Sequence, residues 1–282
     1  MKCIICESSQ FKGLYNKMLL QCNSCNFITA NIQLSSNEVF LLYNNDYFTG
    51  KEYYNYILDK TIIQKNFKKR LDKINKFYPS LKMNRILEIG CAYGFFGQLI
   101  TKKYCKEYIG YDVSKEAIEY GKSNFNLSLY TDNYLDTIHK ENFYSDVFLW
   151  DVIEHLKEPE LYLKKIAEEL CEGGRIYLTT GDISRFIPKI QGKKWRLIHP
   201  PTHLHYFSKK TITKILNNNG FEIIDISYPS IFRSIKLIFY SLFILNKKDN
   251  TLKNKILKSI PQHWSFPLNT FDIMFVIAEK RK

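Results

Sequence analysis

The sequence lacks a long, uninterrupted apolar run. Its longest apolar stretch, Ile231–Leu245, is broken by Arg233 and Lys236, and it falls short of the roughly 20 apolar residues that a helix needs to span a bilayer. The chain also shows no charged leader followed by an apolar core and a small-residue cleavage site. We therefore expect a cytoplasmic protein without a transmembrane segment.

Acidic residues are in short supply. The 282 residues include 41 Lys and Arg against 28 Asp and Glu, a net charge of +13. This balance favours an anionic partner, such as a nucleic acid, a phosphorylated or nucleotide-linked metabolite, or an anionic membrane face, without choosing among them. A composition of 45% apolar and 24% charged residues is typical of a globular protein and excludes a disordered or collagen-like chain.

Four of the seven cysteines form two C-x2-C pairs, Cys3 with Cys6 and Cys22 with Cys25. Two such pairs separated by 15 residues have the spacing of a zinc ribbon, in which four thiolates hold one tetrahedral ion. Residues 1–30 contain too few large apolar side chains to fold without a cross-link or an ion. We therefore predict a structural zinc ribbon at residues 1–30; two disulfides or four free thiols are the alternative.

Residues 31–83 are predicted to be a helical connector. Ser35 and Glu38 have the spacing of a capping box before residues 39–43, and a second helix is marked by apolar residues at three-to-four spacing, namely Ile63, Phe67, Leu71, Ile74 and Tyr78. An aromatic segment, Tyr43–Tyr56, lies between the two helices. We expect it to pack between the ribbon and the main domain rather than to face a substrate.

From Arg85 onward, strands alternate with helices. Apolar runs occur at Ile86–Ile89, Tyr108–Tyr111, Val147–Trp150 and Ile176–Thr179, and later at Phe221–Ser227 and Asp272–Ala278, the last two separated by an insertion at about residues 231–268. Alternating β and α units predict an α/β domain over residues 84–282 with a doubly wound, mostly parallel sheet.

The first strand-to-helix turn of this domain carries the chemical signal. Its sequence is Ile86-Leu-Glu-Ile-Gly90-Cys-Ala-Tyr-Gly94, and glycine there allows a ligand to approach the backbone closely. The G-x-G-x-x-G dinucleotide fingerprint fits badly, because Ala92 and Phe95 occupy its second and third glycine positions. Asp112, 22 residues after Gly90, is placed to accept the hydroxyls of a ribose; a helix N-cap is its alternative role.

On these residues the chain resembles the class I S-adenosylmethionine-dependent methyltransferases. The resemblance covers Glu88-x-Gly90-x-x-x-Gly94, Asp112, Thr131-Asp132, the segment from Ser145 through Asp151, Glu154 and His155, and the turn after Leu170. It implies a seven-stranded Rossmann-like sheet and S-adenosylmethionine as cofactor. The residues that it implies for cofactor binding are Glu88, Gly90, Ala92, Tyr93, Gly94, Asp112, Val113, Asp132, Asn133, Trp150 and Asp151. Ala92 departs from the glycine that many members have.

The order of the parts gives a narrower resemblance. A zinc ribbon, the aromatic segment, the methyltransferase core and the late stretch His199-Pro-Pro-Thr-His203-Leu-His205-Tyr-Phe-Ser208 resemble zinc-ribbon methyltransferases that modify bacterial sugars and surface polysaccharides. This implies an acceptor that is a small molecule or a glycan and is anionic when linked to a nucleotide.

Three histidines are candidates for the chemistry on the acceptor. His155 follows the fourth strand, and His203 and His205 lie in the loop after the fifth, so both loops open on one crevice. A neutral imidazole can take the proton of a hydroxyl as the methyl group arrives. We predict that His155, His203 and His205 form the catalytic set, although His155 also suits a structural helix start.

A metal-assisted variant is the alternative mechanism. Asp151, Glu154, His155 and His205 resemble the divalent-metal site of small-RNA 2′-O-methyltransferases, and Glu154-His155 resembles that of quinone O-methyltransferases. Two carboxylates and two imidazoles would hold Mg²⁺ or Mn²⁺ beside the acceptor oxygen.

The sequence therefore predicts a methyltransferase acting on a hydroxyl, with a carbon as second choice, of a sugar, a nucleotide-linked sugar or a surface-polysaccharide precursor. An RNA methyltransferase that uses the ribbon and the basic surface is the alternative function.

Overall fold

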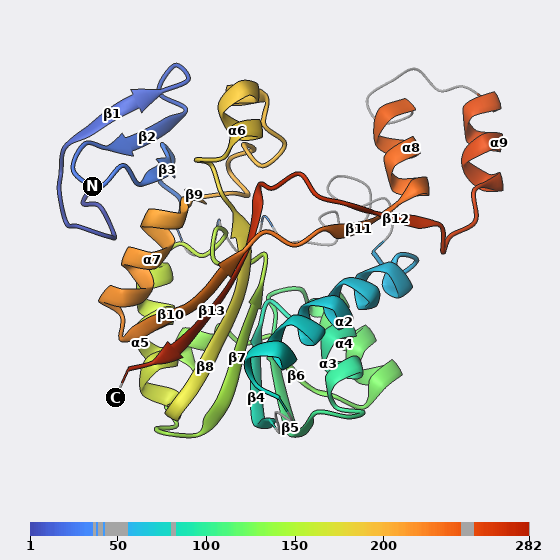
Figure 1. Ribbon diagram of the computed structural model, residues 1–282, viewed down its shortest axis with the longest axis horizontal. Helices are drawn as coiled ribbons and strands as arrows, with labels where there is room; N and C mark the ends of the chain where they lie inside the picture. The colour runs from blue at the N-terminus through green and yellow to red at the C-terminus, as the bar shows by residue number, and fades with distance from the viewer. Residues whose placement is uncertain (36–37, 39–41, 43–55, 80–82, 244–250, 282) are drawn as a thin grey trace. The chain divides into compact units, whose positions relative to one another are not determined.

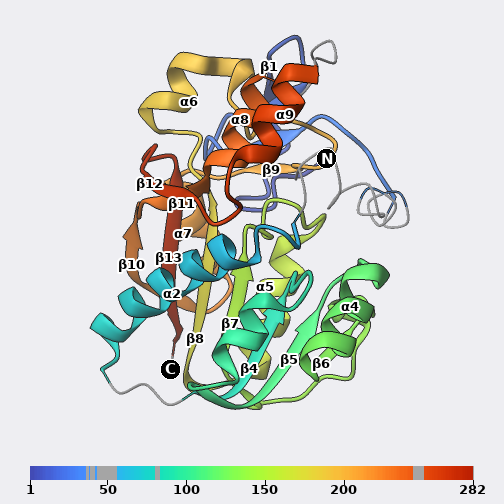
Figure 2. The ribbon, with the colours of Figure 1, turned by 90° about the vertical axis from the view of Figure 1, so that its right-hand side faces the viewer.

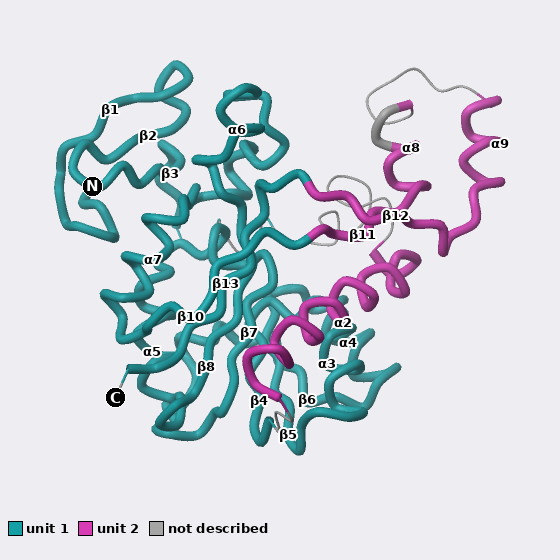
Figure 3. The backbone as a smooth tube through the Cα atoms, viewed as in Figure 1, with its two compact units in different colours: residues 1–42, 82–229, 270–282 teal, residues 43–81, 230–269 magenta. Residues whose placement is uncertain are grey.

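The computed structural model describes residues 1–35, 38, 42, 56–79, 83–243 and 251–281. The chain forms two compact units, one of residues 1–42, 82–229 and 270–282 and the other of residues 43–81 and 230–269 (Figure 3). The predicted helix at residues 39–43, apart from Leu42, and the aromatic segment up to residue 55 lie outside the described residues.

The first unit is built on a seven-stranded sheet (Figures 1 and 2). In order across the sheet, its strands are β10 (Phe221–Ser227), β13 (Ile273–Lys280), β8 (Leu170–Gly181), β7 (Tyr144–Trp150), β4 (Met83–Ile89), β5 (Cys105–Tyr111) and β6 (Ser128–Tyr130). The five strands from β8 to β6 run parallel, whereas β13 is antiparallel to both β8 and β10. The predicted doubly wound, mostly parallel sheet is confirmed.

Helices cover both faces of this sheet. They are α3 (Phe95–Ile100), α4 (Lys115–Phe125), α5 (Pro159–Glu169) and α7 (Lys209–Asn218). Because alternate side chains of a strand point to opposite faces, Val147 shares a core cluster with Leu163 of α5 and Ile212 of α7, whereas Phe148 packs against Phe96 of α3, with ring centroids 4.7 Å apart. Near-continuous apolar strands are therefore buried from both sides, as a parallel sheet requires.

The order of the strands locates the place where a ligand would bind. The chain leaves β4 toward β5 but leaves β7 toward β8, in the opposite direction across the sheet. In open α/β sheets, ligands bind outside the carboxyl ends of the strands at such a switch point. The loops after β4 and β7 are therefore the first candidates for a binding site.

The cysteine-rich segment forms a second, four-stranded sheet with part of the main domain. Its own strands are β1 (Phe11–Leu14), β2 (Leu19–Cys22) and β3 (Ile28–Ala30), and its fourth strand, β9 (His205–Tyr206), comes from the loop between β8 and α7. This loop also contains α6 (Phe186–Gln191) and the short 3₁₀ turn η3 (Gly192–Lys194). A second 3₁₀ turn, η2 (Tyr134–Asp136), follows β6. Cys3 and Phe27 belong to the same core cluster as Phe207 and Ile212.

The second unit joins two segments that are far apart in the sequence. Helix α2 (Lys60–Phe77) contacts β11 (Ile231–Ser234), which pairs with β12 (Ser265–Leu268). Helices α8 (Ile235–Phe243) and α9 (Thr251–Ser259) lie between these two strands in the sequence. The Asn66 amide makes both backbone hydrogen bonds of one strand residue: Nδ2 donates to the Phe232 carbonyl at 3.0 Å, and Oδ1 accepts from the Phe232 N–H at 2.7 Å. A polar side chain of α2 thus pairs with β11 as a neighbouring strand would.

Within the described part of the chain, we find no helix whose length and apolar character would let it cross a membrane.

Candidate functional site

The loop after β4 is held in a conformation that favours glycine. Gly90, Ala92 and Gly94 have φ angles of 75°, 45° and 72°, and Gly94 is the N-cap of α3. A Cβ on Gly90 would lie 2.3 Å from Cγ2 of Val152, in the loop after β7. The two loops at the switch point are therefore packed so closely that only glycine fits there.

Asp112, at the end of β5, organises this loop. Its carboxylate accepts the Ala92 N–H at 2.7 Å and the Ser114 N–H at 2.9 Å, and the N-cap of α4 is Ser114 rather than Asp112. Burial raises the pKa of Asp112, and the two N–H donors oppose that rise. Each carboxylate oxygen accepts one backbone bond here and retains a second lone pair, which leaves capacity for ribose hydroxyls.

Glu88 lies beneath the loop and is buried. The Tyr108 hydroxyl donates a hydrogen bond to its Oε2, and burial raises the pKa of the Glu88 carboxyl well above its usual value. Burial therefore favours the protonated form of this carboxyl. An ammonium group brought close to it would favour the ionised form.

The other residues expected to bind the cofactor follow neighbouring strands. Asp132 and Asn133 come after β6, and the Asn133 side chain is engaged locally, since it donates to Asp136 at 2.9 Å and accepts from the Tyr162 hydroxyl at 2.7 Å. Trp150 ends β7 and is buried, whereas Asp151 follows it with φ of 56° and is exposed. Tyr93 is buried and Val113 half-buried. All of them lie at the carboxyl ends of adjacent strands; their contact with a cofactor stays a prediction.

The acceptor-side residues form a cluster whose members differ from the expected set. Ligand atoms of Glu154, His155 and His203 lie within 4.8 Å of one another. The ring centroid of His203 is 4.5 Å from that of His155 and 3.9 Å from that of His199. We name Glu154, His155, His199 and His203 the histidine cluster. His199 was not among the expected catalytic residues, although its i,i+4 spacing from His203 was a signal for it.

Burial controls the ionisation of the histidine cluster. Burial, with the nearby Asp151 charge, raises the pKa of Glu154 to about 8. Burial lowers the pKa of His155 to about 4, and it lowers that of His203 further below the usual range. The imidazoles of His155 and His203 are therefore neutral at physiological pH, and each retains a lone pair. Oε2 of Glu154 is buried and has no hydrogen-bond partner among the described residues, so the cluster contains a polar atom that a ligand would satisfy.

His205 lies apart from the histidine cluster. Its Nδ1 is 3.1 Å from Oγ1 of Thr29 in β3, and its Nε2 is 3.3 Å from the Lys157 carbonyl. Burial lowers the pKa of His205 to about 4, so the ring is neutral and offers one donor and one acceptor. The Lys157 carbonyl can only accept, which places the proton on Nε2 and leaves Nδ1 as an acceptor. The Thr29 hydroxyl has a single proton to donate, and its oxygen lies 3.1 Å from this Nδ1 and 3.0 Å from the Leu204 carbonyl, which already accepts the Ala30 N–H.

The backbone around His205 connects the ribbon to the histidine cluster. The Ala30 N–H donates to the Leu204 carbonyl at 2.8 Å, and the N–H groups of Leu204 and His205 both donate to the Glu154 carbonyl, at 2.9 and 3.0 Å. Strand β3 of the ribbon thus holds β9, and β9 holds the backbone of Glu154.

The cavity beside these residues is small. Its volume is about 10 Å³, room for roughly one water molecule. It is lined by Glu154, Thr180, Gly181, Trp195, Leu197, His203, His205 and Tyr206. Since His203 and His205 are buried and His155 and His199 are half-buried, the latter two are the histidines that a larger molecule can reach more readily.

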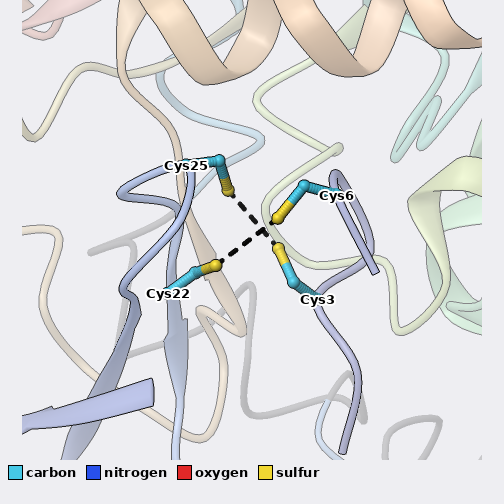
Figure 4. A group of neighbouring side chains, drawn as sticks. All are labelled: Cys3, Cys6, Cys22 and Cys25. Carbon is cyan, nitrogen blue, oxygen red and sulfur yellow. Dashed lines mark hydrogen bonds between the residues drawn. The ribbon is translucent and has the colours of Figure 1, made fainter. Parts of the chain in front are cut away.

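The four ribbon cysteines converge on one point (Figure 4). Their sulfur atoms lie within 4.8 Å of one another, with 3.5 Å between Cys3 and Cys25 and between Cys6 and Cys22. Four thiolates at about 2.3 Å from a tetrahedral zinc ion lie about 3.8 Å apart, and a disulfide needs about 2.05 Å. The arrangement therefore fits one zinc ion and excludes a disulfide in this conformation.

A family model described as a methyltransferase domain matches residues 60–226. A mitochondrial ubiquinone biosynthesis O-methyltransferase of Dictyostelium discoideum is 23% identical over 193 residues, which cover 61% of this chain and 59% of the relative. The match thus spans about three-fifths of that relative's length.

Two solved structures show the same fold. A proposed methyltransferase of Bacillus halodurans has a TM-score of 0.56 at 14% identity and covers 76% of this chain and all of its own. A magnesium protoporphyrin IX methyltransferase of Synechocystis, solved with S-adenosylhomocysteine, has a TM-score of 0.51 at 14% identity and covers 83% of this chain and 90% of its own.

Loss of one ribbon cysteine should affect the histidine cluster. We expect wild-type protein prepared without chelator to hold about one zinc ion and Cys22→Ser to lose it. Because β3 pairs with β9, hydrogen exchange in Cys22→Ser should accelerate both in residues 1–30 and at residues 204–206, while β4 and β5 stay protected. Cys171→Ser, outside the cysteine cluster, should keep zinc. A zinc-free wild type would contradict the ribbon, and unchanged exchange at residues 204–206 would contradict the coupling.

The Thr29 hydroxyl should stabilise the neutral His205 ring. Thr29→Val keeps the shape but leaves a buried imidazole nitrogen without its donor, which should lower the free energy of unfolding by about 1–3 kcal/mol. Thr29→Ser should restore most of the loss, and the His205 ¹⁵N shifts should change in the valine variant alone. Thr101→Val, whose hydroxyl donates to Gly97, controls for loss of a hydroxyl elsewhere. Equal stability of the valine and serine variants would rule the interaction out.

Proposed function

This chain belongs to the methyltransferase-domain family, and from that premise we propose that it methylates a hydroxyl of a sugar, a nucleotide-linked sugar or a surface-polysaccharide precursor. Family and fold make it an S-adenosylmethionine-dependent methyltransferase. The choice of oxygen over carbon is supported by the neutral imidazoles beside the switch point. The narrower sugar assignment depends on the resemblance in the order of its parts.

The cofactor is proposed to lie across the carboxyl ends of β4, β5 and β6. Its amino group would lie toward Glu88, because a nearby ammonium group favours the ionised form of a buried carboxyl. Its ribose would lie on the remaining lone pairs of Asp112. The adenine would lie near Val113, Asp132 and Asn133. Trp150 and Asp151, at the end of β7, would close the site next to the sulfonium.

Within the histidine cluster, we assign the general base to His155. Its Nδ1 is 2.8 Å from the Thr202 carbonyl, which can only accept, so Nδ1 carries the proton and Nε2 is the basic nitrogen. As the acceptor oxygen attacks the methyl carbon and the carbon–sulfur bond breaks, Nε2 would take the hydroxyl proton. His203 packs edge-on against His155, with an angle of 86° between the rings, and would hold its orientation.

A metal-assisted mechanism is the second candidate, because three ligand atoms of the histidine cluster lie close together. The residues that would hold a divalent ion are Glu154, His155 and His203, in place of the expected set with Asp151 and His205. An ion there would lower the pKa of the acceptor hydroxyl. Two imidazoles and one carboxylate suit Mn²⁺ better than Mg²⁺, which prefers oxygen ligands.

RNA is the alternative acceptor, and the net charge of +13 is the observation that favours it. Release of S-adenosylhomocysteine should be measured against a panel of nucleotide sugars and of RNAs. Turnover with a nucleotide sugar and none with RNA supports the proposal. The reverse result would assign the enzyme to RNA.

Asp112 should be essential for cofactor affinity. Asp112→Ala would leave the ribose hydroxyls poorly paired, so we expect binding of S-adenosylhomocysteine to weaken by roughly 1.5–3 kcal/mol, about 10- to 150-fold in Kd. Calorimetry checks this on variants first shown to be folded. Ser114→Ala, which removes the adjacent helix cap but not the carboxylate, is the control and should bind normally. Undiminished affinity of Asp112→Ala would exclude the ribose assignment.

The histidines should affect turnover rather than cofactor binding. General-base catalysis contributes roughly 10²–10⁴-fold, so His155→Ala should lower kcat about a hundredfold or more without changing the Kd for S-adenosylhomocysteine. His203→Ala and His205→Ala should have smaller effects, since we expect these rings to position their neighbours. His263→Ala, exposed and outside the cluster, is the control.

The same variants distinguish the two mechanisms. If turnover lost on mild chelation returns with Mn²⁺, and manganese binding disappears in His203→Ala, the metal-assisted mechanism is correct. Turnover that survives chelation but collapses in His155→Ala supports simple base catalysis. Full activity in all three histidine variants would remove the cluster from the mechanism.

A further inference from the structure

The basic surplus of the chain is concentrated in its second unit. Residues 43–81 and 230–269 contain fifteen Lys and Arg and five Asp and Glu, which accounts for ten of the thirteen surplus positive charges. The remaining residues, although more than twice as many, carry a surplus of only three. The segment of residues 230–269 alone has seven basic residues against a single acid, Asp249. The positive charge is therefore a property of this unit.

The same unit exposes large apolar side chains. Among the described residues of the segment 230–269, six have between 40% and 65% of their surface exposed: Phe243, Leu252, Ile256, Trp264, Phe266 and Leu268. They come from both helices α8 and α9 and from the end of the hairpin. Six exposed apolar groups within one segment of forty residues are more than the scattered single residues that a protein surface normally carries, and they favour an interaction surface.

Helix α9 shows how charge and apolar surface are combined. Leu252 and Ile256, one helical turn apart, form an exposed stripe, while Leu257 is buried. Lys253 lies on one side of this stripe and Lys255 on the other. Lysines that flank an apolar stripe can place their amines at lipid phosphates while their methylene stems follow the apolar surface.

Helix α8 is more apolar still. Its sequence is Ile-Lys-Leu-Ile-Phe-Tyr-Ser-Leu-Phe, yet the side chains of Ile235–Tyr240 are only half-buried and that of Phe243 is exposed. A helix that is apolar on nearly all sides is normally covered by protein or by lipid.

We infer that this unit docks on the surface of an anionic lipid bilayer. The apolar groups would enter the headgroup region and the lysines would pair with acidic headgroups. A tryptophan such as Trp264 prefers this interfacial depth. The contact is peripheral, since no described helix is suited to cross a membrane. The inference does not depend on the identity of the acceptor.

Two other occupants fit these observations less well. A second copy of the chain would bring two units, each with a surplus of ten positive charges, face to face, and like charges oppose that contact. RNA would satisfy the charge, but it offers no apolar cover for Leu252 and Ile256. An anionic bilayer satisfies both the charge and the apolar surface.

Binding to vesicles tests the inference directly. The full chain, prepared without chelator, is mixed with vesicles of phosphatidylcholine and phosphatidylglycerol, whose acidic headgroups give a negative surface potential, and with vesicles of phosphatidylcholine alone. Trp264 serves as the internal probe, because Trp150 and Trp195 are buried whereas Trp264 is 52% exposed. We expect its emission to shift to shorter wavelength and its quenching by acrylamide to fall on the acidic vesicles only. Trp264→Phe should abolish both signals.

Matched variants distinguish the proposed lipid contact from nonspecific hydrophobic binding. Leu252→Ser with Ile256→Ser, both exposed, should weaken partitioning at least tenfold. Lys253→Gln with Lys255→Gln should also weaken it at least tenfold, since each basic residue near an acidic surface contributes about fivefold. The control pair Ile138→Ser and Phe186→Ser removes exposed apolar groups from the first unit and should leave binding unchanged.

Three results would overturn the inference. The first is that the chain does not bind acidic vesicles, and the second is that the control pair loses as much binding as the Leu252 and Ile256 variants. The third is a concentration-dependent dimer in light scattering that becomes monomeric in the Leu252 and Ile256 variants, which would assign the surface to a second copy. Retention on RNA that competes with vesicles and survives the apolar substitutions would likewise assign the surface to nucleic acid. Cofactor affinity is measured alongside, so that a failure of the methyltransferase proposal is seen separately.

Discussion

The pairing of β3 with β9 is the contact on which the arrangement of the histidine cluster depends. Residues 1–30 have little apolar core of their own and are closed by four converging sulfur atoms. The last strand of this segment, β3, pairs with β9, which consists of His205 and Tyr206. Since the backbone of Leu204 and His205 in turn holds the Glu154 carbonyl, geometry imposed at the cysteines is transmitted to the histidine cluster. The ribbon is thus part of the main unit and not an appended module.

Close packing between the loops after β4 and β7 is a second constraint. Gly90 and Val152 approach so closely that any side chain at position 90 would displace one loop from the other. The same region collects buried ionisable groups, Glu88 beneath one loop and Glu154 at the other, both with raised pKa values. Burying a carboxyl without a cationic partner costs stability. Such groups are typical of sites whose polar partner is a ligand.

Sequence reasoning succeeded where the signal is local. Apolar runs predicted six strands of the doubly wound sheet, because each of these strands is an apolar segment bounded by turn residues. The three-residue strand β6 (Ser128–Tyr130) has no such run, and the number of seven strands came from the resemblance to the class I methyltransferases. It did not reach contacts set by distant pairing. His203 and His205 have equivalent positions in the motif, but the β3–β9 register turns His205 toward Thr29, so that His203 and His199 are the residues beside His155. Likewise, nothing local indicates that Asn66 pairs with Phe232, 166 residues later.

The distribution of charge changes how the basic composition is understood. A net charge of +13 suggested an acidic acceptor, such as a nucleotide diphosphate. Yet the unit that contains the switch point, the glycine loop and the histidine cluster has a surplus of only three charges. The surplus lies instead with exposed leucine, isoleucine and aromatic side chains. Charge and apolar surface together are the two features that the inferred docking on an anionic bilayer would use.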